Sequence, residues 1–217
     1  MSIDTGTGAQ SKLDFTMMYA THDAFRRDLG HLVPAADSRT GNLPAFKEGW
    51  AMFEYYLVIH HTAEDRSLWP PIRRKAGASP ERAVLLDAME AEHAVLDPLM
   101  ASVDAQLASG DTGKLRGTME ELSAALTAHL ENEEVKGLPL VDAVLSEKEW
   151  DAFGEEQRAA VGTKGAAQFF PWVLDGAPAS LEEKVLGLVP PPIRFLYRKQ
   201  WRPKYQKRSP WGQTSRA

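Results

Sequence analysis

Apolar side chains recur every three or four positions through four long segments of the first 145 residues, which is the period of an amphipathic helix. The pattern predicts helices at residues 13–33, 45–71, 79–107 and 115–133. Prolines mark several of these limits: Pro34 ends the first helix, Pro70-Pro71 ends the second, and Ser79-Pro80 begins the third. No stretch alternates between apolar and polar residues for long enough to predict a strand. The predicted fold class is therefore all-α.

The links between these segments are short and rich in Gly, Ser and Asp, near residues 37–43, 75–79 and 110–113. Short links between long helices make consecutive helices antiparallel neighbours. We therefore expect an up-down-up-down four-helix bundle over residues 12–145.

Residues 146–217 differ from the bundle segments in composition. They contain seven of the fourteen prolines and four of the six tryptophans. Two capping-box patterns predict the starts of shorter helices: Ser146…Glu149 and Ser180…Glu183. Because a segment of about 70 residues makes a weak core by itself, we expect a C-terminal helical extension packed on the bundle.

The net charge of −5 is unevenly distributed along the chain. Residues 193–217 contain eight Lys and Arg and no acidic residue, which leaves 17 basic and 30 acidic residues, a net charge of −13, in residues 1–192. A basic, aromatic tail of this kind can contact nucleic acid, anionic lipid or a protein, or it can cover the acidic body of its own molecule. We favour the intramolecular contact. Nucleic acid is not expected as a partner, and a protein partner stays open for this tail.

Several classes of protein are excluded by what the sequence lacks. It has no cysteine, which rules out disulfides, iron–sulfur clusters, thiolate zinc sites and cysteine nucleophiles. The N-terminus has neither the basic nor the apolar region of a secretory signal. No run approaches the roughly 18 apolar residues that a membrane-spanning helix needs. We therefore expect a cytoplasmic protein without a membrane span.

Each of the four apolar stripes contains a histidine, and two of them also contain a glutamate. These six residues are His22, His60, Glu64, His93, His129 and Glu133. Imidazoles and carboxylates are rarely buried without a partner. Glu64 follows His60 by four positions, as Glu133 follows His129, so each pair shares one face of its helix. Two helices therefore present the same His-x-x-x-Glu motif.

The four histidines are predicted to lie at one level of the bundle. In antiparallel helices, two residues lie at the same height when they are equally far from the turn that joins the helices. The midpoints between successive histidines fall in the predicted turns, at residues 41, 76–77 and 111. Both glutamates then lie about one helical turn, roughly 6 Å, from this level. Such a buried group indicates bound metal, and nitrogen and oxygen donors without thiolate suit iron, manganese or zinc.

Together these residues form a pattern that resembles the hemerythrin-like (HHE) cation-binding domain over about residues 12–145: His22, His60-x-x-x-Glu64, His93, His129-x-x-x-Glu133. The resemblance implies a centre of two carboxylate-bridged iron ions per chain. By position, the implied ligands are His22 and His60 for one iron, His93 and His129 for the other, and Glu64 and Glu133 as bridges.

At one position, the chain departs from the oxygen carriers of the family that it resembles. Animal hemerythrins have a second histidine four residues before the one that matches His93, whereas this chain has Met89 there. The resemblance therefore implies a more open iron than in the oxygen carriers. This difference argues against reversible oxygen carriage.

An open metal position is typical of catalytic or ligand-binding sites rather than structural ones. We therefore expect a non-haem di-iron protein that binds or reacts with a small ligand, O2, NO or H2O2. A catalase-like decomposition of peroxide is the enzymatic form of this hypothesis, and no catalytic residue is assigned from the sequence. The alternative is an iron- or oxygen-responsive interaction module in which the metal orders the bundle.

The remaining candidates are interpreted mostly as structural. His61 lies about 100° from His60 around the helix and is expected at a helix interface. Asp65 and Glu134 are expected in solvent, with a hydrogen bond to a ligand imidazole as the alternative. Tyr56 is expected to pack in the core.

Overall fold

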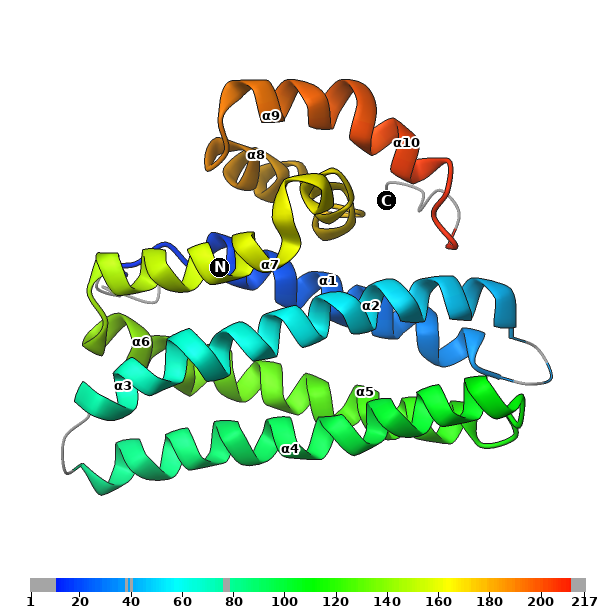
Figure 1. Cartoon of the computed structure of the whole chain (residues 1–217), viewed down its shortest axis with the longest axis horizontal. Helices are drawn as coiled ribbons and strands as arrows, with labels where there is room; N and C mark the ends of the chain where they lie inside the picture. The colour runs from blue at the N-terminus through cyan, green and yellow to red at the C-terminus, as the bar shows by residue number, and fades with distance from the viewer. Residues whose placement is uncertain (1–10, 38, 40, 76–78, 212–217) are drawn as a thin grey trace, which may run out of the picture.

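The computed structural model describes residues 11–211 except residues 38, 40 and 76–78, and this part of the chain consists of helices and turns without a strand (Figure 1). The predicted all-α fold class is confirmed. None of the described helices combines the length and the apolar character that crossing a bilayer requires.

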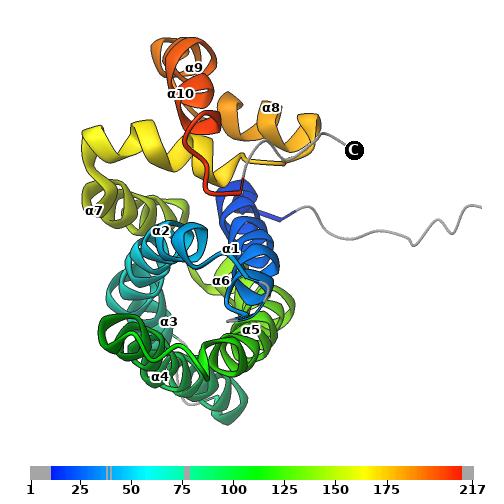
Figure 2. The ribbon, with the colours of Figure 1, turned by 90° about the vertical axis from the view of Figure 1, so that its right-hand side faces the viewer.

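The long helices in the first two thirds of the chain form a bundle: α1 (Thr16–Ala35), α2 (Leu43–Ala63), α4 (Pro80–Ser109) and α5 (Leu115–Asn132). Viewed along the bundle they make a ring, in which α1 lies beside α2 and α5, and α4 lies beside α5 (Figure 2). The connections between successive helices alternate between the two ends of the bundle (Figure 1). At one of them, Gly110 ends α4 with a φ of 76°, the left-handed conformation that commonly stops a helix.

Two bundle helices continue through π-helical turns into short helices: η1 (Glu64–Leu68) into α3 (Trp69–Lys75), and η2 (Glu133–Gly137) into α6 (Leu138–Val144). The prediction that Pro70-Pro71 ends the second helix is therefore wrong. Proline lacks a backbone N–H, and its ring clashes with the carbonyl four residues earlier. In η1 the N–H of Trp69 bonds instead to the carbonyl of Glu64, five residues back, and this wider turn lets the helix pass Pro70.

The C-terminal extension lies against the side of the bundle that α1 and α2 form (Figures 1 and 2). Its elements are α7 (Glu147–Val173), α8 (Ala179–Gly187), α9 (Pro191–Leu196), η3 (Tyr197–Trp201) and α10 (Arg202–Gln206). α7 bends at Gly162, whose φ of 69° is not helical, and it begins with the predicted Ser146–Glu149 capping box. The second predicted capping box is wrong, because α8 begins directly after Pro178 and Ser180 lies inside it.

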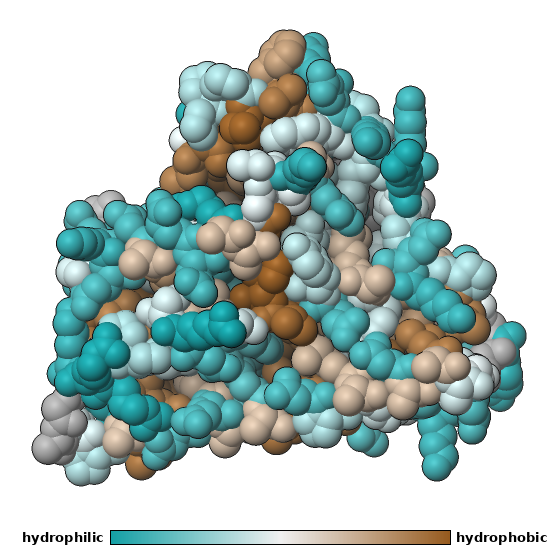
Figure 3. Space-filling view, in the orientation of Figure 1, coloured by the Kyte–Doolittle hydropathy of each residue, from teal (hydrophilic) through white to brown (hydrophobic). Residues whose placement is uncertain are grey.

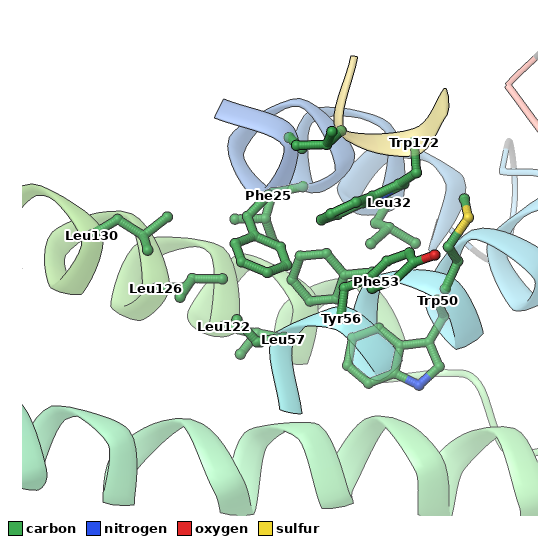
Figure 4. Close-up of a cluster of buried hydrophobic side chains, with 14 of the residues drawn as sticks. Phe25, Leu32, Trp50, Phe53, Tyr56, Leu57, Leu122, Leu126, Leu130 and Trp172 are labelled. Atoms are coloured by element: carbon green, nitrogen blue, oxygen red, sulfur yellow. The ribbon is translucent and has the colours of Figure 1, made fainter. Parts of the chain in front are cut away.

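The apolar core is shared between the bundle and the extension (Figure 4). Trp172 of α7 is fully buried, and its ring centroid lies 4.3 Å from that of Tyr56 and 5.4 Å from that of Phe25. The indole Nε1–H donates a hydrogen bond to Asp28 Oδ2 at 2.7 Å. Arg27 donates to the backbone carbonyl of Trp172 at 2.8 Å. These contacts fix the extension to α1 and α2.

Buried apolar residues of the described chain form a main cluster and a second cluster at different levels of the bundle. Along α2, Phe53 and Leu57 belong to the main cluster, whereas Leu68 and Ile72, in the continuation of this helix, belong to the second. The same division occurs along the other bundle helices. A layer of polar side chains lies between the two clusters.

Replacing Trp172 by alanine is expected to destabilise the protein by about 3–5 kcal/mol, because the change removes a large buried ring. Denaturant-induced unfolding measures the loss. Phe195→Ala is the control: the Phe195 side chain is 61% exposed, so its removal should change the stability by no more than about 0.5 kcal/mol. Equal stabilities of the two variants would show that Trp172 does not hold the extension in place.

Candidate metal centre

The polar layer contains all six residues that the sequence predicted for a metal site: His22 of α1, His60 of α2, His93 of α4, His129 of α5, and Glu64 and Glu133. None of these residues is more than 6% exposed. Glu64 and Glu133 are the first residues of the π-helical turns η1 and η2. The structure therefore brings the predicted residues together at one level inside the bundle.

The histidines form close pairs, and a glutamate lies between them. His22 Nε2 lies 3.1 Å from His60 Nε2. His93 Nε2 likewise lies 3.1 Å from His129 Nε2. Glu64 Oε1 lies 2.9 Å from His60 Nε2, and Glu64 Oε2 lies 3.4 Å from His93 Nε2. One carboxylate oxygen of Glu64 therefore faces each pair.

In the described part of the chain, buried histidine and glutamate side chains form two groups that could each hold a metal ion. The members of the first group are His22, His60, Glu64 and Glu133, and those of the second are His61, Glu64, His93 and His129. Within each group the potential ligand atoms all lie within 4.8 Å of one another. Glu64 belongs to both groups, whereas Glu133 joins the first through Oε2, which lies 3.2 Å from His22 Nε2.

The chemistry of both groups fits a cation. Among the described residues, no hydrogen bond of suitable geometry reaches any carboxylate oxygen of Glu64 or Glu133. Buried carboxylates without partners are costly, and a metal ion beside them removes that cost. Two imidazole nitrogens that bind one ion at about 2.0–2.1 Å lie about 3 Å apart when they are adjacent ligands. Both histidine pairs have this spacing.

A family model described as the hemerythrin HHE cation binding domain matches residues 13–141, more than half of the chain. The chain belongs to the hemerythrin family. No curated protein and no solved structure matches it significantly. Hemerythrin domains bind a metal, typically iron, and the buried histidines and glutamates of this chain form groups that could hold one.

Carboxylates around this group of residues hold the outer nitrogen of three of its histidine rings. The Nδ1 contacts are His22 with Glu134 at 2.8 Å, His93 with Asp65 at 3.0 Å, and His129 with Glu92 at 2.9 Å. A carboxylate in this position fixes the tautomer and the orientation of a ligand imidazole, so that Nε2 faces the metal. Asp65 and Glu134 are therefore hydrogen-bonded to the site, which was the alternative to their expected place in solvent.

Glu92 is a residue of the centre that the sequence analysis missed. It lies on α4, but its partner His129 lies on α5, 37 positions later. Asn132 also donates a hydrogen bond to it, at 2.8 Å. The periodicity of α4 does not indicate these contacts, because they depend on how α4 and α5 are rotated about their axes. The equal-height rule could have found the pair, since its midpoint falls in the turn at residues 110–113.

The surrounding carboxylates also determine the protonation of two histidines in the metal-free protein. Burial by itself lowers the pKa of His22, but the nearby carboxylates of Glu133, Glu134 and Glu64 outweigh it and raise the pKa to about 9. Burial likewise lowers the pKa of His93, but carboxylates led by Asp65 raise it to about 10. Imidazole binds metal in its neutral form, so metal binding at this centre releases protons.

A cavity of about 940 Å³ lies between the extension and the bundle and reaches His60. Its lining is mainly apolar and includes Met18, Tyr56, Ile59, Phe169, Phe170 and Ile193. On the face drawn in Figure 3, apolar side chains run from the extension across the junction onto the bundle. The His60 side of the centre therefore borders an apolar space.

Glu92→Ala is expected to weaken metal binding about 10- to 100-fold, because His129 loses the carboxylate that orients its ring. Competition with a chromophoric chelator measures the affinity. Glu90→Ala is the matched control on α4, since the Glu90 side chain is 79% exposed and pairs with Arg73 away from the centre. If both variants bind metal as tightly as the unchanged protein, the contact of Glu92 with His129 does not support the site.

Proposed function

We propose that this hemerythrin-family protein holds two carboxylate-bridged iron ions per chain and binds or reacts with a small ligand: O2, NO or H2O2. The observation that carries the proposal is the position of Glu64, whose oxygens face different histidine pairs. The proposed ligands are His22 and His60 for one iron, His93 and His129 for the other, and Glu64 and Glu133 as bridges.

Iron bound here would supply redox chemistry and exchangeable coordination positions, since these side chains do not fill two coordination spheres. The chain itself provides the surroundings. The apolar clusters on either side of the polar layer keep bulk water away from the ligands. The outer carboxylates keep the Nε2 atoms directed inward. The apolar cavity beside His60 suits the approach of O2 and NO, which are small and uncharged.

Decomposition of peroxide, in which two H2O2 give two H2O and one O2, is the enzymatic form of the proposal. Met89 supports it. This residue is fully buried one turn before His93 and offers no nitrogen to the centre. The helix α4 therefore contributes fewer imidazoles than in the oxygen carriers, which favours reaction over reversible carriage.

An interaction module ordered by its metal is the second candidate function, and the surface of the basic tail favours it. Its aromatic residues Tyr197, Trp201 and Tyr205 pack against the main apolar cluster, and Arg202 pairs with Glu182 at 3.0 Å. The basic and aromatic side chains of the described tail that remain exposed are Phe195, Arg198, Lys199, Lys204, Lys207 and Arg208. A positively charged surface with an exposed aromatic ring suits an acidic protein partner.

The purified protein is expected to contain close to two iron ions per chain. Glu64→Ala should lose most of this iron, because Glu64 belongs to both candidate groups. Glu131→Ala, an exposed glutamate on α5, should leave the iron content unchanged. Elemental analysis measures the content, and the ultraviolet–visible spectrum reports bridged iron. Zinc or no metal after expression in iron-replete cells would contradict the di-iron proposal and favour the interaction module.

Ile59→Trp is expected to slow the binding of NO to the reduced protein several-fold, because the larger side chain occupies the cavity beside His60. Stopped-flow absorbance measures the association rate, and the iron content of the variant shows whether the centre is intact. Val58→Trp is the control, since the neighbouring Val58 is 47% exposed and lies outside the cavity lining. The same rate in both variants would show that ligands reach the centre by another path.

A further inference from the structure

We propose that His61 is an additional metal ligand of this centre and binds through Nε2, together with His93 and His129. This inference rests on the proposed function, because it assigns a residue to one of the two proposed metal positions. The ligand set is then asymmetric. One position has three imidazoles, from His61, His93 and His129, and the other has two, from His22 and His60.

His61 is buried in a way that packing alone does not explain. Its side chain is 7% exposed, and Nε2 has no hydrogen-bond partner among the described residues. The ring stacks on His93, with centroids 4.1 Å apart and an interplanar angle of 17°. It meets His129 edge-on at 5.2 Å. A buried polar nitrogen without a partner costs about 1–3 kcal/mol, which a bound cation would offset.

The neighbours of His61 are ligand-type atoms of the second group. Its potential ligand nitrogen lies within 4.8 Å of those of His93 and His129 and of a Glu64 oxygen. No rearrangement of the helices is needed to add this nitrogen to the group.

The local sequence explains how the adjacent residues His60 and His61 would bind at different metal positions. Neighbouring residues on a helix point about 100° apart, so His60 turns toward α1 and His61 toward α4 and α5. Glu64 follows His60 by four positions and His61 by three, so it lies on the surface that both share. The motif His-His-x-x-Glu therefore places one carboxylate between two imidazoles of the same helix.

The extra imidazole comes from α2, whereas α4 offers His93 to this position and has the apolar Met89 one turn earlier. The position of His22 and His60 has fewer imidazoles and lies on the side that borders the cavity.

The test compares iron retention in the full-length protein with that of His61→Leu, which keeps an apolar side chain in the layer, and His61→Ala, which leaves space. One of the two irons in each variant should be lost to a chelator at least about tenfold faster. Added imidazole should restore retention in His61→Ala, because it fits the vacated space, and not in His61→Leu. Circular dichroism checks that both variants keep their helices.

His31→Ala is the control, since His31 stacks on Trp211 away from the centre and should release iron like the unchanged protein. Two irons retained at the unchanged rate in both His61 variants would overturn the role of His61 and leave the di-iron proposal intact. Faster loss of iron that added imidazole does not reverse in His61→Ala would also overturn the role of His61 as a ligand, because a structural role does not respond to free imidazole. If the protein without substitutions does not contain two irons, the di-iron proposal is overturned. Titration with Zn²⁺ then decides the role of His61 separately: equal Zn²⁺ affinity with and without His61 would overturn it.

Discussion

The whole fold depends on one constraint: a layer of imidazoles and carboxylates crosses the apolar core of the bundle. Each bundle helix contributes a histidine to this layer, and the layer divides the core into a main and a second cluster. Carboxylates that accept no hydrogen bond at this depth are costly. A bound cation therefore links the chemistry of the site to the stability of the bundle, because it acts on all these helices at the same level.

In the π-helical turns η1 and η2, neighbouring carboxylates contact different nitrogen atoms of the histidines. Glu64 faces the centre, while Asp65 bonds to His93 of another helix. Glu133 and Glu134 repeat this arrangement around His22. In η1 and η2 a proline follows six positions after the first residue of the turn, and the same spacing occurs in η3, which starts at Tyr197 and has no ligand. The prolines therefore account for the wider turns, and the centre makes use of the geometry that results.

The extension changes the surroundings of the centre without adding a residue to either candidate group. Trp172 fixes α7 to α1 and α2 through its stacking on Tyr56 and its hydrogen bond to Asp28. Beyond this contact, α7 bends at Gly162, and the cavity that reaches His60 lies between the extension and the bundle. The two sides of the centre therefore differ: one borders the cavity, and on the other Asp65 and Glu92 hold the outer nitrogens of His93 and His129.

The sequence by itself determined the helical class and placed the six candidate residues near one level of the bundle. Both follow from periodicity and distance from a turn, which are properties of the chain alone. Sequence-based prediction failed at Pro70, because a proline usually signals a helix end, whereas here the preceding turn widens and the helix continues. Equal height pairs Glu92 with His129, but only the tertiary structure decided that these side chains face each other and where His61 lies. Both depend on how each helix is rotated about its axis, which packing between distant segments determines.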